Sequence, residues 1–326
     1  MANEFTLVEL SKIEEDPRRK SVIDTLLWSS NIMQVIPWET IGALSTTITR
    51  LGTLPTVGFR KINAGYSVST GALEQRVENI SLMGGNFDTD KAIVRSKTKL
   101  STARAIVQVM MTKAMAYKFN DKFINGNPEN NPEEFKGLEE RVNDLYDEGY
   151  TGQRVDVAGG SATEGILASA AISHNFLNKF DKAMYQVKGH NPQLALMNSN
   201  VLLAIRAIMR KDGLLDVTKN AMDEVVDRVR NTILVDIGVN ADQTTEIIAE
   251  NETLGDGTTE SSIFFVKFGI GELFWGIQEY PLEVTDKGLL ESAPIYRTEV
   301  DWPLGLAMAD PYCMSRLFVI IASNAA

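Results

Sequence analysis

The strongest periodic pattern in this chain spans residues 100–124, LSTARAIVQVMMTKAMAYKFNDKFI. Its apolar side chains recur every three or four positions in two stripes, which predicts a helix packed on more than one side. At about 1.5 Å per residue, such a helix is roughly 37 Å long. Asn125 and Gly126 follow it, and both tolerate the left-handed conformation of a helix end, so we expect the helix to stop there.

Residues 51–99 have a different character. The stretch GTLPTVGFRKINAGYSVSTG has strand-like alternation broken by glycines, and ALEQRVENISLMGGNFDTDKAIVRS follows with a second alternating stretch. We predict a long, two-armed β excursion in which glycines supply the turns. Because an isolated two-stranded ribbon is marginal in water, something outside the ribbon should hold it in place.

Residues 1–50 are predicted to form an arm. Apolar residues with helical spacing run from Val22 to Met33, and Pro37 ends the pattern. The segment is too short to build a core of its own. It therefore packs either on its own domain or on a neighbouring subunit, and the sequence leaves both alternatives open.

The rest of the chain mixes helix and strand patterns without a regular β-α-β alternation. Helices are predicted over residues 163–187 and from Asn198 or Ser199 to a stop at Gly213. QLALMN and NTILVDIGV are typical of strands, and two more strands flank the glycine-rich bend in FVKFGIGELFWGI. The tail from residue 294 predicts long strands with one break, so the fold class is α+β.

Composition limits the partners of this 326-residue chain. Its net charge is −11, so it has no general attraction for nucleic acids, whose binders neutralise phosphates with Lys and Arg. The single cysteine, Cys313, cannot form an intrachain disulfide, and its apolar neighbours indicate a buried thiol. No apolar run is long enough to span a membrane and MANEFTLVEL is not a secretion signal, so we expect a soluble, cytoplasmic protein with no membrane partner.

Residues that could carry chemistry are few. His174 and His190 have no partner at metal-ligand spacing, which favours structural or solvated histidines. In DLYDEGY, Asp144, Asp147 and Glu148 could bind a cation or work as an acid–base pair, although a solvated turn is the commoner use of such a cluster. We therefore predict no catalytic residue, no cofactor, no metal site and no enzyme.

The junction after the long helix carries a family resemblance. INGN, a polar spacer and then FKGL resemble the same region of HK97-type major capsid proteins of tailed bacteriophages. In that family the long "spine" helix ends at an Asn-Gly turn, and a short loop leads to a Gly-Leu segment of the peripheral domain. The matching positions are Phe123, Ile124, Asn125, Gly126, Phe135, Gly137 and Leu138. The resemblance implies that Asn125, Gly126, Phe135 and Gly137 form an architectural junction.

The resemblance extends over most of the chain. LGTLPTVGFRKINAGY followed by GGNFDTDKAI is similar to the extended loop of a capsid subgroup, and later phrases are similar to strands of the axial and peripheral domains. The matching loop positions are Leu54, Pro55, Phe59, Arg60 and Asn63. An HK97-like fold implies five regions: an N-terminal arm (1–50), an extended loop or E-loop (51–99), a peripheral domain with the spine helix (100–187), an axial domain (188–290) and returning peripheral strands (291–326).

This resemblance implies a phage or prophage major capsid protein. Its copies would self-assemble as hexamers and pentamers into an icosahedral shell that expands during procapsid maturation and encloses double-stranded DNA without sequence-specific binding. Assembly would occur in the bacterial cytoplasm with a scaffolding protein, a portal and a decoration protein as candidate partners, and the product would be a virion. The chain has only about fifty residues before the loop, so any scaffold is expected to be separate or already removed.

Three regions are expected to contact neighbouring subunits. They are the arm, the loop around Tyr66 to Phe87, and the axial-domain loops near Asp242 to Glu260. The residues expected at these interfaces are Trp28, Ile32, Met33, Trp38, Phe59, Arg60, Tyr66, Gln75, Arg76, Phe87, Asp242 and Glu250.

Two other functions stay open. One is an encapsulin-type compartment, a shell of the same fold that holds an enzyme in place of DNA. The other is a soluble metal-dependent hydrolase that uses the Asp144, Asp147 and Glu148 cluster. Some capsid proteins also cross-link loop lysines to a neighbour's asparagines, but no local pattern singles out Lys61, Lys91 or Lys97, and we expect surface lysines there.

Overall fold

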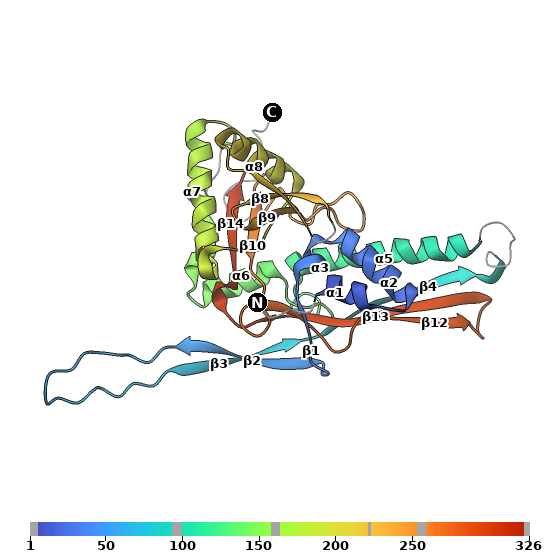
Figure 1. The fold of residues 1–326 in the computed structure, drawn as a ribbon, viewed down its shortest axis with the longest axis horizontal. Helices are drawn as coiled ribbons and strands as arrows, with labels where there is room; N and C mark the ends of the chain where they lie inside the picture. Colours follow the sequence, from blue (N-terminus) through green and yellow to red (C-terminus); the bar gives the residue numbers. More distant parts are fainter. Residues whose placement is uncertain (1–5, 93–99, 158–163, 221–222, 253–258, 323–326) are drawn as a thin grey trace.

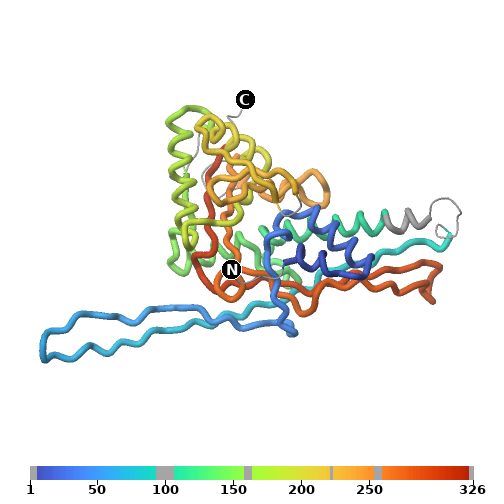
Figure 2. The backbone as a smooth tube through the Cα atoms, viewed as in Figure 1, coloured from blue at the N-terminus to red at the C-terminus, as the bar shows by residue number. Residues whose placement is uncertain are grey.

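The computed structural model describes residues 6–92, 100–157, 164–220, 223–252 and 259–322. In these residues the strands form a five-stranded sheet, a seven-stranded sheet and a two-stranded hairpin. Figures 1 and 2 show a body built on the two larger sheets, from which the hairpin projects. No helix in the described ranges is long and apolar enough to cross a membrane.

The five-stranded sheet carries the N-terminal helices and the long helix on one side (Figure 1). Its strand order is β1-β11-β13-β12, and β4 pairs antiparallel with β13 along its whole length. Apolar side chains from the helices and the sheet form one continuous core. The elements are α1 (Leu7–Ile13), α2 (Pro17–Ser29), α3 (Asn31–Val35), α5 (Leu100–Asn125), β1 (Trp38–Thr40), β4 (Ser81–Asp90), β11 (Phe274–Gln278), β12 (Glu283–Leu289) and β13 (Ile295–Met308).

The seven-stranded sheet is buried on both faces at its centre. On strand β6, Leu194 and Leu196 join the core shared with α5, whereas Ala195 and Met197 join a second core under α7 and α8. A strand covered on both sides reads as an unbroken apolar run, which is why QLALMN has no alternation. The order is β5-β14-β10-β6-β9-β8-β7. The elements are β5 (Arg154–Asp156), β6 (Leu194–Met197), β7 (Asp216–Lys219), β8 (Val225–Val229), β9 (Thr232–Asp236), β10 (Ser261–Val266), β14 (Met314–Ile320), α7 (Ala170–Gln186) and α8 (Ser199–Asp212).

Short elements connect these layers. Helix α6 lies where the two large sheets and the hairpin meet (Figure 1). The remaining elements are α6 (Leu138–Asp147), η1 (Thr151–Gln153), η2 (Lys188–His190), η3 (Pro311–Cys313), and the hairpin strands β2 (Ser45–Thr53) and β3 (Ala72–Asn79).

Helices with complete local signals match their predictions. Helix α5 covers Leu100–Asn125, as its periodicity predicts, but neither Asn125 nor Gly126 has the left-handed backbone that was expected at its end. Asn198 caps α8 by accepting a hydrogen bond from the Val201 amide at 2.9 Å, and Gly213 ends that helix at φ +68°. Helix α7 begins later than predicted, at Ala170, because the Ser169 side chain caps it.

The single arm helix predicted over Val22–Met33 is wrong. Helix α2 ends at Ser29, and a separate helix, α3, begins at Asn31. Ser30 has extended backbone between them, and its hydroxyl accepts a hydrogen bond from the Met33 amide at 3.3 Å. The same hydroxyl donates to Asn120 of α5 at 2.6 Å, so a contact with a distant helix fixes the break.

The predicted β excursion over 51–99 also needs correction. The projecting ribbon starts earlier, because β2 begins at Ser45, and it ends earlier, because β3 ends at Asn79. From Ser81 the chain joins the five-stranded sheet as β4, in register with β13 from Leu304 to Ile295. Residues 93–99 lie outside the described ranges.

Candidate assembly surfaces

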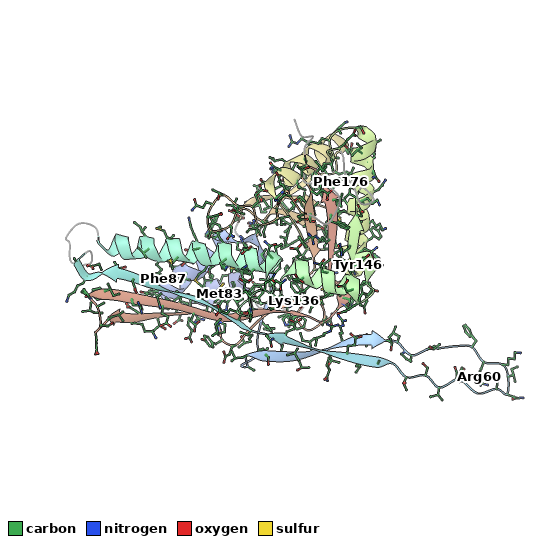
Figure 3. The ribbon with its side chains drawn as sticks, turned by 180° about the vertical axis from the view of Figure 1, so that it is seen from behind. Arg60, Met83, Phe87, Lys136, Tyr146 and Phe176 are labelled. Atoms are coloured by element: carbon green, nitrogen blue, oxygen red, sulfur yellow. The ribbon has the colours of Figure 1, made fainter. Side chains whose placement is uncertain are left out.

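The hairpin tip, residues 54–71, lies far from the body of the molecule (Figures 1 and 3, where Arg60 marks its end). Phe59 is fully exposed, with a relative accessibility of 110%. Exposed apolar area of this kind marks an interaction surface in a soluble protein. The large apolar side chains exposed on the tip are Leu54, Val57, Phe59, Ile62, Tyr66 and Val68.

The tip is basic as well as apolar. Arg60 and Lys61 are its only charged residues. The Arg60 guanidinium lies 5.2 Å from the centre of the Tyr66 ring and donates a hydrogen bond to the Ala64 carbonyl at 3.2 Å. Asn63 turns the chain with φ +65°, a conformation that asparagine tolerates. The structure thus brings three residues expected at an interface, Phe59, Arg60 and Tyr66, onto one exposed tip.

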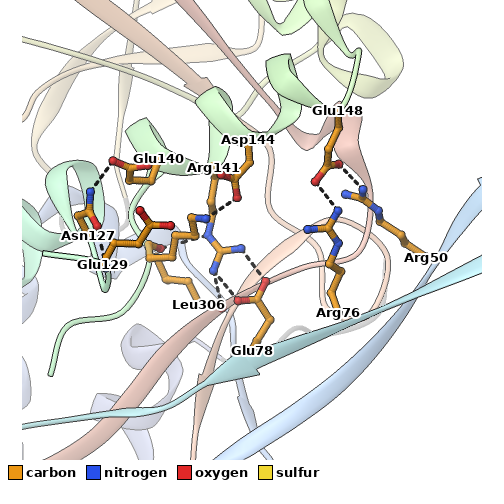
Figure 4. Close-up of polar contacts among 11 residues, drawn as sticks. Arg50, Arg76, Glu78, Asn127, Glu129, Glu140, Arg141, Asp144, Glu148 and Leu306 are labelled. Atoms are coloured by element: carbon orange, nitrogen blue, oxygen red, sulfur yellow. Dashed lines mark hydrogen bonds and ion pairs between the residues drawn. The ribbon is translucent and has the colours of Figure 1, made fainter. Parts of the chain in front are cut away.

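The base of the hairpin is held by ion pairs to α6 (Figure 4). Arg141 donates two hydrogen bonds to Glu78 of β3, at 2.6 and 2.8 Å, and a third to the Leu306 carbonyl at 2.9 Å. Glu148, the residue that caps the end of α6, accepts hydrogen bonds from both Arg50 of β2 and Arg76 of β3. The hairpin therefore leaves the body from a fixed, charged support.

These contacts shift the acidity of Glu148. Burial acts to raise its pKa, but the hydrogen bond from Arg50 and the charges of Arg50 and Arg76 outweigh burial, so the pKa of Glu148 lies below its usual value. Arg50 is itself buried, and it also pairs with Glu74 at 2.9 Å. The carboxylate at this site is thus held in its charged form at neutral pH.

The sequence alone did not predict that α6 supports the hairpin. Part of the pattern behind this contact is nevertheless visible in the sequence of β3. Glu74, Arg76 and Glu78 alternate along β3, so their side chains share one face of the ribbon, and that face meets α6. Gln75, on the opposite face, is exposed. Of the two β3 residues expected at a subunit interface, Gln75 is open to solvent, whereas Arg76 is half-exposed and bound to Glu148.

The junction after α5 brings its four predicted residues together. The Gly126 amide donates to the Lys122 carbonyl at 2.9 Å, and the Gly137 amide donates to the Gly126 carbonyl at 2.8 Å. Asn125 donates from Nδ2 to the Ile247 carbonyl at 2.9 Å, and Phe135 is buried. A Cβ atom at Gly137 would lie 2.6 Å from the Gly126 nitrogen, so the two backbone segments approach as only glycine allows.

Several residues that were expected at a subunit interface are buried inside the chain itself. Ile32, Met33, Trp38 and Phe87 lie in the chain's own core and offer no surface to a neighbour in this conformation. Trp38, for example, packs against Trp302 at a ring-centroid distance of 4.7 Å. Of the four arm residues expected at an interface, Trp28 alone is exposed, at 58%. The first alternative, packing on the chain's own domain, therefore holds for the other three.

The expected axial-domain loop is described only in part, because residues 253–258 lie outside the described ranges. Asp242 is exposed and accepts hydrogen bonds from the amides of Thr244 and Thr245, at 3.0 and 2.9 Å. With the Thr245 hydroxyl as the largest cause, these bonds lower the pKa of Asp242. Glu250 accepts a hydrogen bond from Asn200 at 2.6 Å, which ties the loop to α8.

The carboxylates of DLYDEGY do not converge on a common site. Asp144 pairs with Lys136, Glu148 pairs with the hairpin arginines, and Asp147 is exposed. Within the described ranges, no group of three or more His, Cys, Asp or Glu side chains could hold a metal ion. The metal-dependent hydrolase thus loses the cluster on which it was based.

The two histidines and the cysteine also lack the surroundings of a catalytic or metal site within the described residues. His190 stacks on Tyr185 at a ring-centroid distance of 4.5 Å, with its Nδ1 2.8 Å from the Tyr185 carbonyl, and His174 is exposed. Cys313 is buried, and burial raises the pKa of its thiol.

Comparison with known proteins supplies the class. The family model described as "Major capsid protein GP7" matches residues 14–209. A search of curated proteins gives no match.

Several solved shell structures share the fold. The SrpI encapsulin of Synechococcus elongatus PCC 7942 is 14% identical, with a TM-score of 0.59 over 90% of this chain and 89% of that one. The capsid of a native GTA particle is 14% identical, with a TM-score of 0.58 over 90% of each chain. A structure from Mycobacterium phage Bobi is 12% identical, with a TM-score of 0.56 over 88% of this chain and 89% of that one.

These matches confirm the predicted α+β, HK97-like capsid fold. Since the family model covers more than half of the sequence, the chain belongs to the major capsid protein GP7 family. It is a structural protein whose copies form a capsid shell, and it is a component of a virion.

Proposed function

We propose that this chain tiles the icosahedral head of a tailed phage or prophage as hexamers and pentamers, and that the shell encloses double-stranded DNA. The observation that carries the proposal is the hairpin tip, where large apolar side chains are exposed far from the body. Such a surface promotes aggregation in a protein that works as a monomer, whereas in a protein that binds its own copies it forms the contact between subunits. The role is mechanical, with no catalytic step.

The direction of the hairpin supports contacts between copies. In Figure 1 the hairpin extends to one side of the body, and the free ends of β4, β12 and β13 extend to the other. Because the tip points away from its own sheet, the tip of one copy would bind a part of the next copy other than that copy's tip. Such a contact is head-to-tail. Repeated around an axis, head-to-tail contacts close into rings, the form that hexamers and pentamers take.

The five regions serve this function as follows. The arm, expected over residues 1–50, has Trp28 as its exposed contact, and from Ser45 onward the chain belongs to the hairpin, because β2 begins there. The peripheral domain, expected over 100–187 and 291–326, is centred on α5 and the five-stranded sheet, which also includes β11 and β12. The extended loop, expected over 51–99, makes its contacts through the tip. The axial domain, expected over 188–290, is centred on the seven-stranded sheet, which also includes β14 from the last segment of the chain. Its Asp242 and Glu250 loops surround the axis of each ring.

The negative net charge of the chain bears on how the shell wall would interact with packed DNA. A chain of net charge −11 does not adhere to packed DNA, so the wall needs no sequence-specific contact with it. A scaffolding protein, a portal and a decoration protein are the further partners, and the particle assembles in the cytoplasm of the bacterial host before it expands.

The test removes the tip and leaves the body intact. The deletion must stop short of β4, because Ser81 to Asn86 pair with β13 inside the five-stranded sheet. Replacing residues 54–71 by an Asn-Gly turn keeps both hairpin strands. We expect a folded subunit by circular dichroism and no closed shells by negative-stain electron microscopy, beside shells from the unchanged chain with its scaffold. Closed shells from the shortened chain would overturn the proposal.

An encapsulin-type compartment is the second candidate, because the fold matches the SrpI encapsulin as well as it matches the GTA capsid. The contents of particles isolated from the native host separate the two. Nuclease-protected DNA inside the particles supports the phage head, and a stoichiometric protein cargo without DNA supports the compartment.

A further inference from the structure

Helix α6 makes three sets of charged contacts along its length, and together they reach two different parts of the fold. Glu139, in its first turn, binds Arg316 of β14 in the seven-stranded sheet. Arg141 binds Glu78 of the hairpin, and Glu148 binds the hairpin arginines. One ten-residue helix thus joins the seven-stranded sheet to the base of the hairpin.

The contact with the seven-stranded sheet joins a buried arginine to the partly exposed Glu139. The Arg316 side chain is inaccessible to solvent, and its guanidinium donates to Glu139 at 3.0 Å, to Glu252 at 2.9 Å and to the Ser262 hydroxyl at 3.0 Å. It also lies 4.9 Å from the centre of the Phe264 ring. Because each of the three guanidinium nitrogens has a partner, a shift of α6 along β14 would take Glu139 away from a buried charge.

The contact with the hairpin is equally constrained. The Arg141 side chain is buried, and its bidentate pair with Glu78 fixes both the distance and the orientation of β3. The Leu306 carbonyl takes a further donor from the same guanidinium, so β13 shares the site. Glu148 holds β2 and β3 about two turns further along α6.

We propose that α6 is a positioning element that couples the direction of the hairpin to the position of the seven-stranded sheet. A displacement of β14 moves Glu139 through Arg316, and the rigid helix carries Arg141 and Glu148 with it. The direction in which the tip is presented then follows the sheet. The inference rests on the proposed function, since it assigns to α6 the control of the surface that binds a neighbouring copy.

The test measures hairpin direction inside one subunit. Spin labels at Gln75→Cys on the hairpin and Asn178→Cys on α7 are both at exposed positions, whereas the native Cys313 is buried. Labelled chain is diluted into an excess of unlabelled chain, so that double electron–electron resonance reports distances within one subunit whether or not shells form. The unchanged chain should give one narrow distance distribution.

Three substitutions then separate coupling from local support. Glu148→Ala removes hairpin contacts directly and should broaden the distribution at least twofold. Glu139→Ala touches no hairpin residue, yet coupling through α6 requires a comparable broadening or a shift of the mean distance. Glu140→Ala is the matched control, because Glu140 lies on the same helix but bonds only to Asn127 among the contacts described, and it should leave the distribution unchanged.

An unchanged distribution in Glu139→Ala beside a broadened one in Glu148→Ala would overturn the coupling. If Glu139→Ala does not fold by circular dichroism, Glu139→Gln takes its place with the same expectation and the same contrary outcome. The two proposals can fail separately. Closed shells formed without the tip would contradict the assembly role and would not affect the coupling. An unchanged distance distribution in Glu139→Ala would contradict the coupling and would not affect the assembly role.

Discussion

Arg141 and Glu78 form a two-bonded ion pair between helix α6 and hairpin strand β3, with Nη1–Oε1 at 2.6 Å and Nη2–Oε2 at 2.8 Å. Both side chains are largely withdrawn from solvent, with accessibilities of 4% and 13%. The pair joins residues 63 positions apart in the sequence, so the base of the hairpin depends on a tertiary contact and not on its own pairing alone.

Removing one partner of this pair should be costly. Glu78→Ala leaves the Arg141 guanidinium buried without its carboxylate, and we expect a loss of about 3–5 kcal/mol in the free energy of unfolding, measured by urea denaturation. The double variant Glu78→Leu with Arg141→Met removes both charges and should recover most of the loss. A single variant as stable as the unchanged chain would show that the pair does not hold the hairpin.

Acidification should release the other hairpin contact. The pKa of Glu148 lies below its ordinary value of 4.5, so its contribution is complete above about pH 4.5 and is lost as the pH falls through the lower folded value. Protonated Glu148 no longer attracts Arg50 and Arg76, although Arg50 keeps its pair with Glu74. The distance distribution between labels on the hairpin and on α7 should therefore broaden as the pH is lowered below 4.5.

A matched variant assigns that change to one carboxylate. Glu148→Ala should already be broad at pH 7 and should change less over the same window. If the unchanged chain and Glu148→Ala respond to acid in the same way, Glu148 does not control the hairpin.

The sequence predicted elements whose signals are local, and it could not predict what covers them. Helix α5 has its periodicity and its Asn-Gly stop in one stretch, and α8 has both of its caps. The apolar face of the arm was visible as a pattern, but a pattern does not tell whether the cover is the same chain. Ile32 and Trp38 proved to be core residues for that reason.

The hairpin shows the same limit. Alternation predicted strand over residues 52–71, whereas β2 ends at Thr53 and β3 begins at Ala72. The departure of β4 from the ribbon depends on β13, more than two hundred residues later. The ion pairs of α6 likewise join charges that are ordinary in the sequence and become significant only when the fold brings them together. The exposed tip, by contrast, was predictable, because too few of its residues could form a core.

The tip should matter for assembly and not for folding. Phe59→Asp places a charge on a side chain that already faces solvent, so the free energy of unfolding of the subunit should change by no more than about 0.5 kcal/mol. Shell yield, measured by sedimentation and electron microscopy, should fall sharply because the apolar contact with a neighbour is lost. Phe59→Leu, which keeps an apolar side chain, is the control and should still assemble. Normal shells from Phe59→Asp would exclude Phe59 from the contact.

Any side chain at Gly126, in the junction after α5, should destabilise the folded subunit. A Cβ atom there would collide with the carbonyl oxygens of Lys122 and Phe135, both of which belong to backbone that cannot swing aside. We expect Gly126→Ala to lower the free energy of unfolding by about 1–3 kcal/mol or more, measured by urea denaturation. Gly58→Ala is the matched control, because nothing lies within 4 Å of a Cβ at Gly58, and it should leave stability unchanged. Equal stability of the two variants would mean that the junction has room that this structure does not show.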